Sequence, residues 1–174
     1  MRERRTAREI ALQALYAEEM TGYSIAQVEN DVINAMKMAE ELRVFARALF
    51  TTASIHKTQI DEFIRNKSQN WDFERIAIID RLIIRMAITE FLYFDDIPPK
   101  VSISEAIEIA KKYSTDDSSA FVNGILDAVL HQISEQIVHK LSLPGPGEES
   151  EHKRHKPRIR KKRKSGRPNS TDKS

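Results

Sequence analysis

The 174-residue sequence predicts an all-α fold, and three observations support this prediction. Apolar residues recur at spacings of three and four far more often than in alternation, which is the pattern of amphipathic helices. Only two glycines precede residue 144, so few residues there disfavour a helix. No regular succession of strand and helix patterns occurs, which argues against a parallel α/β sheet.

Three helices are predicted at the start of the chain. The first covers about residues 6–20, where an apolar stripe follows an arginine-rich start, and Gly22 ends it. Ser24 can cap a second helix, which is predicted to continue to about residue 38. A third helix with an inward apolar face follows over about residues 40–57.

A short helix is predicted around residues 60–64, before a polar break at Arg65–Asn70 that joins two helical subdomains. Residues 74–94 are apolar on nearly every side, which predicts a central helix covered by its neighbours. The Pro98–Pro99 pair requires a turn. Ser102–Glu105 has the pattern of a capping box and is predicted to start the next helix.

Asp116 and Asp117 precede the last predicted helix, whose apolar stripe runs over residues 121–137. Pro144–Gly147 closes the folded part. We therefore expect a folded region over residues 1–143, with subdomains of about 1–65 and 66–143.

Residues 144–174 are predicted to form a disordered basic tail. From Glu148 onward Ile159 is the single aliphatic residue, too little apolar surface to offset the entropy of folding. Residues 153–174 hold eleven of the 28 Lys and Arg residues and one acidic residue, a net charge of about +10. The rest of the chain carries 17 basic and 25 acidic residues, about −8, so a nucleic-acid site there must depend on local patches.

Several classes of protein are not supported by the composition. The chain has no Cys, so it has no disulfide framework, and a reducing cytosol is the natural compartment. The apolar segment 76–94 is interrupted by charged residues, which argues against a membrane span. The five His lack a carboxylate frame, and no glycine-rich phosphate loop or nucleophile motif occurs. We expect no metal, no cofactor and no catalytic site.

A first candidate binding site is an arginine cluster at the start of the first helix. Guanidinium groups and free backbone N–H groups converge there, which suits phosphate, and Tyr16 on the same helix could stack on a base. The alternative is a solvated helix end screened by neighbouring acidic residues. The cluster comprises Arg2, Arg4, Arg5 and Arg8.

The tail is a second candidate, because its charge density attracts polyanions through counterion release without reading their sequence. The alternative is a solubilising extension without a dedicated partner. The basic run comprises Arg158, Arg160, Lys161, Lys162, Arg163, Lys164 and Arg167.

A third candidate is the loop and helix start at residues 114–123, where polar side chains surround Phe121. Helix capping, with Phe121 in the core, is the preferred explanation of these residues alone, and a partner surface is the functional interpretation. Asp80 and Arg85 lie on the apolar central helix and must reach solvent, a partner or a pairing group. An internal ion pair is the simpler explanation for them.

Four segments together resemble the NusB family over roughly residues 2–135. The resemblance implies two small, packed antiparallel bundles of the three-helix type, no cofactor, and a role in a bacterial transcription complex. The matching segments are RRTAREIALQALY, NWDFERIAIIDRLIIRMAITEF, PPKVSISEAIEIAKKYS and SSAFVNGILDAV.

The resemblance also implies specific partners. Members of the family bind the boxA element of nascent ribosomal RNA, usually together with NusE, which is also a small-subunit ribosomal protein. The complex joins RNA polymerase and suppresses premature termination, and some members form a homodimer when free. On this basis we expect a noncatalytic, cytoplasmic antitermination factor.

By position, the family's RNA-binding arginine motif falls on Arg4, Arg5 and Arg8, with Arg2 an additional candidate, and Phe121 falls at or beside its RNA contact. The positions associated with NusE fall on Tyr16, Asp80 and Asp117.

The basic tail departs from the family, whose typical members end soon after the last helix. Two rival functions stay open. One is a helical protein-interaction scaffold with only nonspecific RNA affinity. The other is an accessory domain of the kind fused to ribosomal RNA methyltransferases, but no cofactor-binding domain follows here.

Overall fold

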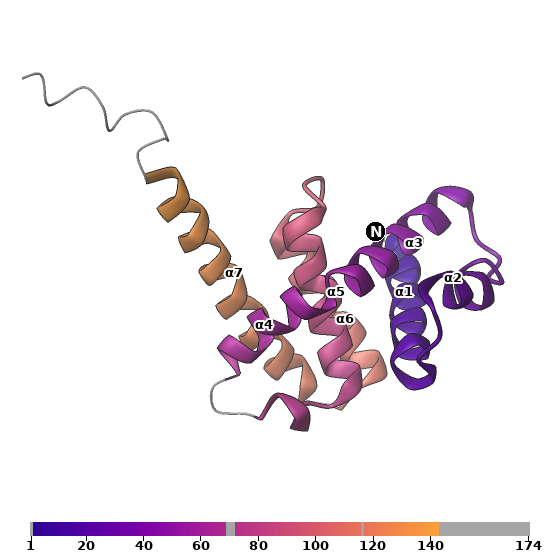
Figure 1. Cartoon of the computed structure of the whole chain (residues 1–174), viewed down its shortest axis with the longest axis horizontal. Helices are drawn as coiled ribbons and strands as arrows, with labels where there is room; N and C mark the ends of the chain where they lie inside the picture. Colours follow the sequence, from indigo (N-terminus) through magenta and orange to yellow (C-terminus); the bar gives the residue numbers. More distant parts are fainter. Residues whose placement is uncertain (1, 69–71, 116, 143–174) are drawn as a thin grey trace, which may run out of the picture.

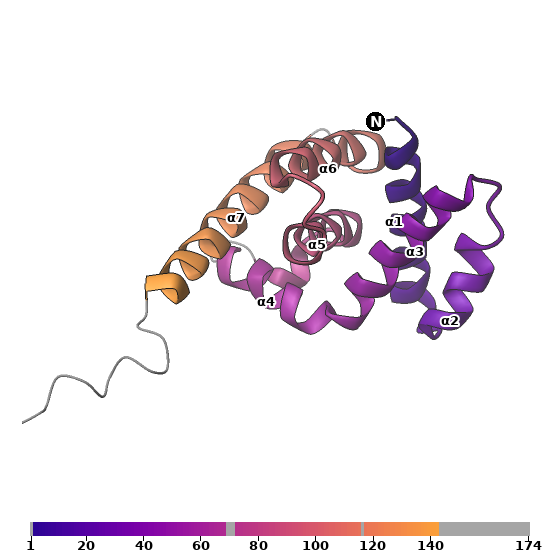
Figure 2. The same ribbon diagram turned by 90° about the horizontal axis from the view of Figure 1, so that it is seen from above.

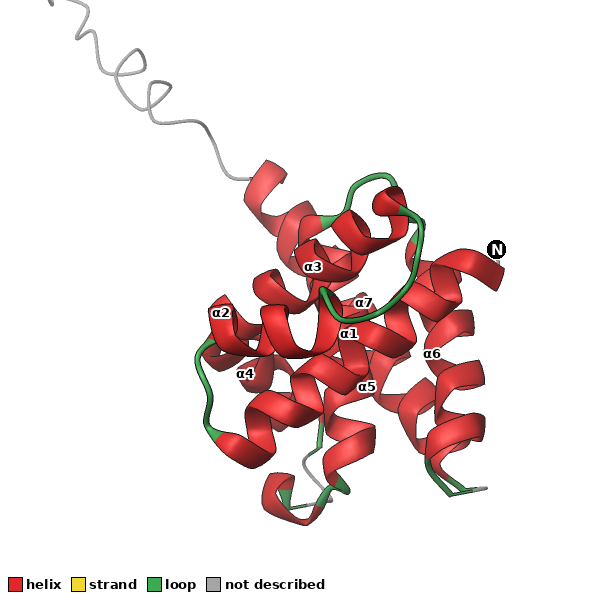
Figure 3. Cartoon of the chain, turned by 90° about the vertical axis from the view of Figure 1, so that its right-hand side faces the viewer, coloured by secondary structure: helices red, strands yellow, loops and turns green. Residues whose placement is uncertain are grey.

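The computed structural model describes residues 2–68, 72–115 and 117–142. The side chains of Arg2 and of residues 137–142, and the predicted tail, lie outside this description. Every regular element of the described ranges is a helix, which confirms the predicted fold class (Figure 3).

Four α-helices and one π-helical turn come from the first part of the chain (Figure 1). Their bounds are α1 Arg2–Thr21, α2 Ile25–Val28, η1 Glu29–Ile33, α3 Glu40–Ile55 and α4 Lys57–Lys67. A short 3-10 turn and three longer helices follow. Their bounds are η2 Phe73–Arg75, α5 Ile78–Tyr93, α6 Pro99–Tyr113 and α7 Ser118–Ser142.

Helix α5 is the central element, as its all-round apolar sequence predicts. Figure 2 views it nearly end-on, with α1, α3, α4, α6 and α7 arranged around it. Every residue from Asp80 to Glu90 is buried, including the charged ones. The helix therefore carries ionisable groups into the interior, and each of these needs a partner there.

One continuous core connects the two halves of the chain. Ala14 of α1, Phe50 of α3 and Ile84 of α5 are fully buried in the same apolar cluster as Ile109 of α6 and Leu126 of α7. No helix in the described part of the chain has the length and apolar character needed to cross a membrane.

The turn after α1 forms as predicted, but the second helix is shorter than expected. Gly22 has a φ of 68°, a conformation that favours glycine, and Ser24 and Gln27 form a reciprocal capping box. The predicted helix to residue 38 instead ends with η1. Arg43 of α3 explains part of this ending, because its guanidinium donates to the carbonyl oxygens of Asn34 and Met36 at 3.1 and 3.3 Å.

The predicted start of α6 is wrong. The helix begins at Pro99, with Pro98 as its N-cap residue, because a proline is well suited to the first helical position. Ser102 and Glu105 therefore lie inside the helix and do not cap it. Both are buried, and both face partners on other helices.

Candidate nucleic-acid interface

Arg8, the last arginine of the cluster on α1, is an interior residue. Its side chain is 4% exposed and its guanidinium binds both carboxylate oxygens of Glu90 on α5, at 2.7 and 3.1 Å. Glu90 also accepts a hydrogen bond from the Ser102 hydroxyl. Arg8 thus joins α1 to the central helix, and its charge is already neutralised inside the protein.

Arg5 joins α1 to α6. Its Nε and Nη2 atoms donate to the two carboxylate oxygens of Glu105 at 2.7 and 2.9 Å, and Glu108 lies 3.7 Å from Nη1. The hydrogen bond from Arg5 is the main cause that lowers the pKa of Glu105 below its ordinary value. Arg5 is one-third exposed, but each of its three guanidinium nitrogens faces a carboxylate of α6.

Arg4 is the most exposed arginine of the cluster whose side chain is described. About half of its side chain is exposed, and the ion pair that it forms with the exposed Asp96 is 3.3 Å long. Its guanidinium lies 5.2 Å from the centre of the Phe45 ring. An exposed pair of this kind contributes little stability, so Arg4 can exchange Asp96 for a phosphate at low cost.

The surface beside the arginines continues along α1 and α6. Lys112 donates to Glu9 at 2.7 Å, the Tyr113 hydroxyl donates to the same carboxylate at 3.0 Å, and the ammonium group lies 4.9 Å from the Tyr113 ring centre. The hydrogen bond to Glu9 raises the pKa of Lys112. A cation and an exposed aromatic ring therefore lie together at the end of α6, and neither was predicted from the sequence as a site residue.

The loop before α7 and the start of α5 form the second candidate region. The buried Asp80 accepts a hydrogen bond from the Ser118 hydroxyl at 2.8 Å. Asp117 is exposed beside it, and Phe121 is half-buried in the first turns of α7. Hydrogen bonds of Ser118 and the partial burial of Phe121 thus account for part of this cluster, while Asp117 is exposed.

Arg85 does not pair with Asp80. Its guanidinium binds both carboxylate oxygens of Asp61 on α4 at 2.9 and 3.0 Å, and Glu19 of α1 lies 3.7 Å away. Burial acts to raise the pKa of Glu19, but the hydrogen bond from Lys57 and the nearby cations lower it overall. These charges connect α1, α4 and α5 internally and do not form a binding site.

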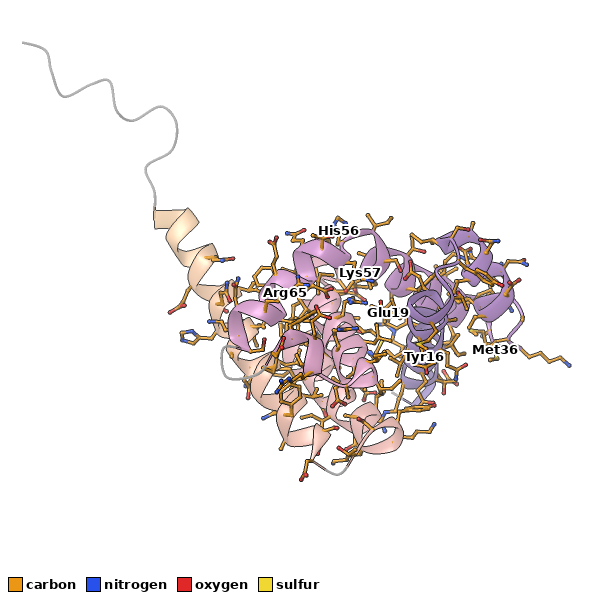
Figure 4. All side chains as sticks on the ribbon, turned by 60° about the horizontal axis from the view of Figure 1, so that its bottom comes forward. Tyr16, Glu19, Met36, His56, Lys57 and Arg65 are labelled. Atoms are coloured by element: carbon orange, nitrogen blue, oxygen red, sulfur yellow. The ribbon has the colours of Figure 1, made fainter. Side chains whose placement is uncertain are left out.

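Tyr16 lies on an exposed part of α1, one turn before Glu19 (Figure 4). It is 41% exposed, and Met20, one turn further along α1, is 56% exposed. Tyr23 follows the end of the helix and is 53% exposed. Large apolar side chains with this exposure form a surface suited to a protein partner. This face is distinct from the buried side of the helix that carries Arg8.

The remaining predicted site residues lie outside the description. They are the side chain of Arg2 and the tail residues Arg158, Arg160, Lys161, Lys162, Arg163 and Lys164. Among the described residues, no three His, Asp or Glu side chains are grouped so that they could hold a metal ion.

Comparison with known proteins decides the family. The model of the NusB family matches residues 5–131, which is most of the chain. The match contains the second candidate region and, of the arginine cluster, Arg5 and Arg8. The chain belongs to the NusB family.

Two relatives named transcription antitermination protein NusB align with most of this family member. The protein from Salinibacter ruber is 43% identical over 137 residues, covering 78% of this chain and 86% of the relative. The protein from Chloroherpeton thalassium is 45% identical over 139 residues, covering 79% of this chain and 66% of the relative. The alignment with the second relative thus leaves about a third of that longer protein unmatched.

A solved structure of the antitermination factors NusB and NusE in complex with dsRNA is also similar. Its matching chain has a TM-score of 0.67 and 25% identity, and the match covers 76% of this chain and 98% of that one. This likeness confirms that the helices of this NusB family member are arranged as in solved relatives.

Sequence reasoning found the arginines but not the carboxylates that hold them. Glu90 and Glu105 each lie within a predicted helix, and no neighbouring residue distinguishes them from surface glutamates. One available signal for Glu90 was its position in the segment 74–94, which is apolar on nearly every side, so that a charged residue there needs a partner. Glu105 was instead assigned to a capping box. Their identification as partners of Arg8 and Arg5 required the packing of α1 against α5 and α6.

Proposed function

We propose that this NusB family member is a noncatalytic adaptor that binds the boxA element of nascent ribosomal RNA together with NusE. In this role it helps RNA polymerase to read through terminators, and it acts in the bacterial cytoplasm, where transcription takes place. The match to the NusB family over residues 5–131 carries the proposal. The solved complex of NusB, NusE and RNA supports the choice of partners.

The proposed RNA site includes Arg4 and Arg5 on α1, with Arg2 extending it, and Phe121 on α7. Arg4 supplies an exposed guanidinium for phosphate, and the one-third exposed Arg5 beside it adds positive charge. Arg8 belongs to the same sequence motif, but its buried pair with Glu90 supports a positioning role. It would hold the start of α1 in place, while the other arginines contact RNA.

The proposed NusE surface contains Tyr16, Asp80 and Asp117. Tyr16 supplies exposed aromatic area beside Met20 and Tyr23, and aromatic residues are enriched at protein interfaces. The exposed carboxylate of Asp117 could pair with a basic group of a ribosomal protein. The basic tail, including Arg158 and Arg160, would add affinity for RNA without adding selectivity.

A transcription assay tests this function directly. Purified bacterial RNA polymerase would transcribe a template that places a boxA-containing leader before a terminator, with NusE and the other elongation factors present. We expect this protein to increase the fraction of full-length transcript, and Arg4→Ala to reduce that increase. A template with a scrambled boxA provides the control.

Readthrough that is equal on the boxA and scrambled templates would contradict the proposal. Loss of all RNA binding, with NusE binding retained, would support the rival scaffold function instead. Conversely, selective RNA binding without any effect on termination would limit the proposal to its adaptor part.

A further inference from the structure

Every arginine of the cluster whose side chain is described already has a carboxylate partner. The partners of Arg5 and Arg8 have side chains that are only 7% and 1% exposed, so these two pairs belong to the packing of the helices. The partner of Arg4 differs, because the side chain of Asp96 is 65% exposed. The pair of Arg4 and Asp96 is therefore the one that an RNA phosphate can open without disturbing the interior.

Asp96 lies in the turn between α5 and α6, and its neighbours hold this turn in place. Ile97 is 5% exposed, and its N–H group donates to the carbonyl oxygen of Phe94 at 3.0 Å. Pro98 and Pro99 follow, and proline rings restrict the backbone on both sides of their own bonds. The turn thus presents the Asp96 carboxylate at a fixed place beside α1.

Arg4 is held at the same place by aromatic contacts. Its guanidinium lies 5.2 Å from the centre of the Phe45 ring, which in turn packs edge-on against Phe94 with 5.9 Å between the ring centres. Arg4 and Asp96 also line one hollow of about 180 Å³. The guanidinium and the carboxylate therefore meet on a surface that the fold builds for both of them.

A phosphate and this carboxylate compete for the same donors. Carboxylates and phosphates both bind a guanidinium through its N–H groups, so RNA has to displace Asp96 from Arg4. Because the turn is fixed, the displaced carboxylate stays close to the incoming phosphate. At a separation of about 6 Å the repulsion of two such charges reduces affinity roughly threefold in water at low salt.

We propose that Asp96 is an internal competitor for RNA phosphate, which sets a threshold for binding at the arginine cluster. It lowers the affinity of Arg4 for any phosphate group. RNA then stays bound only where base contacts or a partner protein add to the binding free energy, which is selection against unsuitable ligands. The inference rests on the proposed RNA-binding function and adds to it a residue that opposes binding.

The first test replaces the carboxylate with an amide of the same size. Labelled boxA-like and scrambled RNAs would be titrated with the full chain at fixed low salt. We expect Asp96→Asn to bind both RNAs about threefold more tightly, because the competitor does not read bases. Asp95→Asn is the matched control, since Asp95 is exposed in the same turn but is not the residue that pairs with Arg4. It should raise affinity less.

A double-mutant cycle separates competition at Arg4 from a general change of charge. In an Arg4→Ala background, Asp96→Asn should bring little or no gain, because no guanidinium remains to be released. The inference is overturned if the gain there is as large as in the wild type. It is also overturned if Asp96→Asn binds no more tightly than the wild type or than Asp95→Asn.

Thermal melts establish that the variants are folded, and Asp96→Asn should melt close to the wild type because an exposed pair contributes little stability. Arg4→Ala that binds RNA as tightly as the wild type would overturn the competitor role and leave the proposed function standing. A wild type that binds neither RNA, with or without NusE, would instead contradict the proposed function itself.

Discussion

Arg4, Arg5 and Arg8 lie within two turns of α1 but differ in how far their side chains are buried. We therefore expect them to have different roles. Replacing Arg8 with Ala leaves the Glu90 carboxylate buried without its cation. We expect this change to lower the free energy of unfolding by about 3–5 kcal/mol. Arg4→Ala is the matched control, because its exposed ion pair contributes about 0–1 kcal/mol. Urea denaturation of both variants checks this, and equal losses would contradict the assigned roles.

Arg4, which contributes little to stability, should contribute to RNA affinity. Arg4→Ala removes one exposed cation, so we expect weaker RNA binding and a salt dependence whose slope is reduced by about one. Arg47→Ala is a suitable control, since that arginine is also partly exposed but pairs with Glu29 elsewhere on the surface. Titrations at several salt concentrations measure both quantities. Identical slopes for Arg4→Ala and the wild type would exclude a phosphate contact by Arg4.

The Arg5–Glu105 pair should make stability depend on pH. Arg5 lowers the pKa of Glu105 in the folded state, so the unfolded chain binds a proton more readily at that residue. Its stabilising contribution is therefore present above the ordinary glutamate pKa of 4.5 and is lost as the pH falls through the lower folded value. We expect Glu105→Gln to flatten the loss of stability below about pH 5. Denaturation curves between neutral and acidic pH test this, and an unchanged acid profile would contradict it.

At the scale of the helices, replacing Gly22 and Gly124 with alanine should change the free energy of unfolding in opposite directions. Gly22 ends α1 at a φ of 68°, so Gly22→Ala should destabilise the protein by about 1 kcal/mol through backbone strain alone. Gly124 lies within α7 with open space around its Cβ position, so Gly124→Ala should stabilise it by about 0.5–1 kcal/mol. Thermal unfolding distinguishes the two, and a destabilising Gly124→Ala would indicate an unrecognised contact.

Helix positions were predictable where the signal was local. The apolar periodicity of α1, α3 and α5 and the turn at Gly22 depend on neighbouring residues, and the structure confirms them. The start of α6 was predicted wrongly because two local signals compete there. A proline at the first helical position placed the start at Pro99, and the serine and glutamate of the apparent capping box serve tertiary contacts instead.

At the scale of the whole molecule, the pairs that define the candidate site join residues far apart in the sequence. Arg5 and Glu105 are separated by 100 positions, and Arg85 finds Asp61 on α4 instead of Asp80 on its own helix. Such partners depend on how the helices dock around α5. A single sequence therefore predicted the arginines as a group, but not which of them the fold uses internally.

The tail provides a further test at this scale. Removal of residues 144–174 deletes the segment that gives the sequence its positive net charge. We expect weaker binding to all RNAs and a smaller salt slope, with the preference for a boxA-like sequence retained. Competition titrations with boxA-like and scrambled RNA measure this. Unchanged affinity and slope would assign the tail no role in RNA binding.

The most direct test of the central claim is a titration of labelled boxA-like and scrambled RNA at fixed salt, with and without NusE, for the wild type and Arg4→Ala. An RNA adaptor should prefer the boxA-like RNA, bind it more tightly when NusE is present, and lose affinity in the variant. Equal binding of both RNAs, unaffected by NusE and by Arg4→Ala, would contradict the adaptor function and leave only nonspecific attraction to a basic chain.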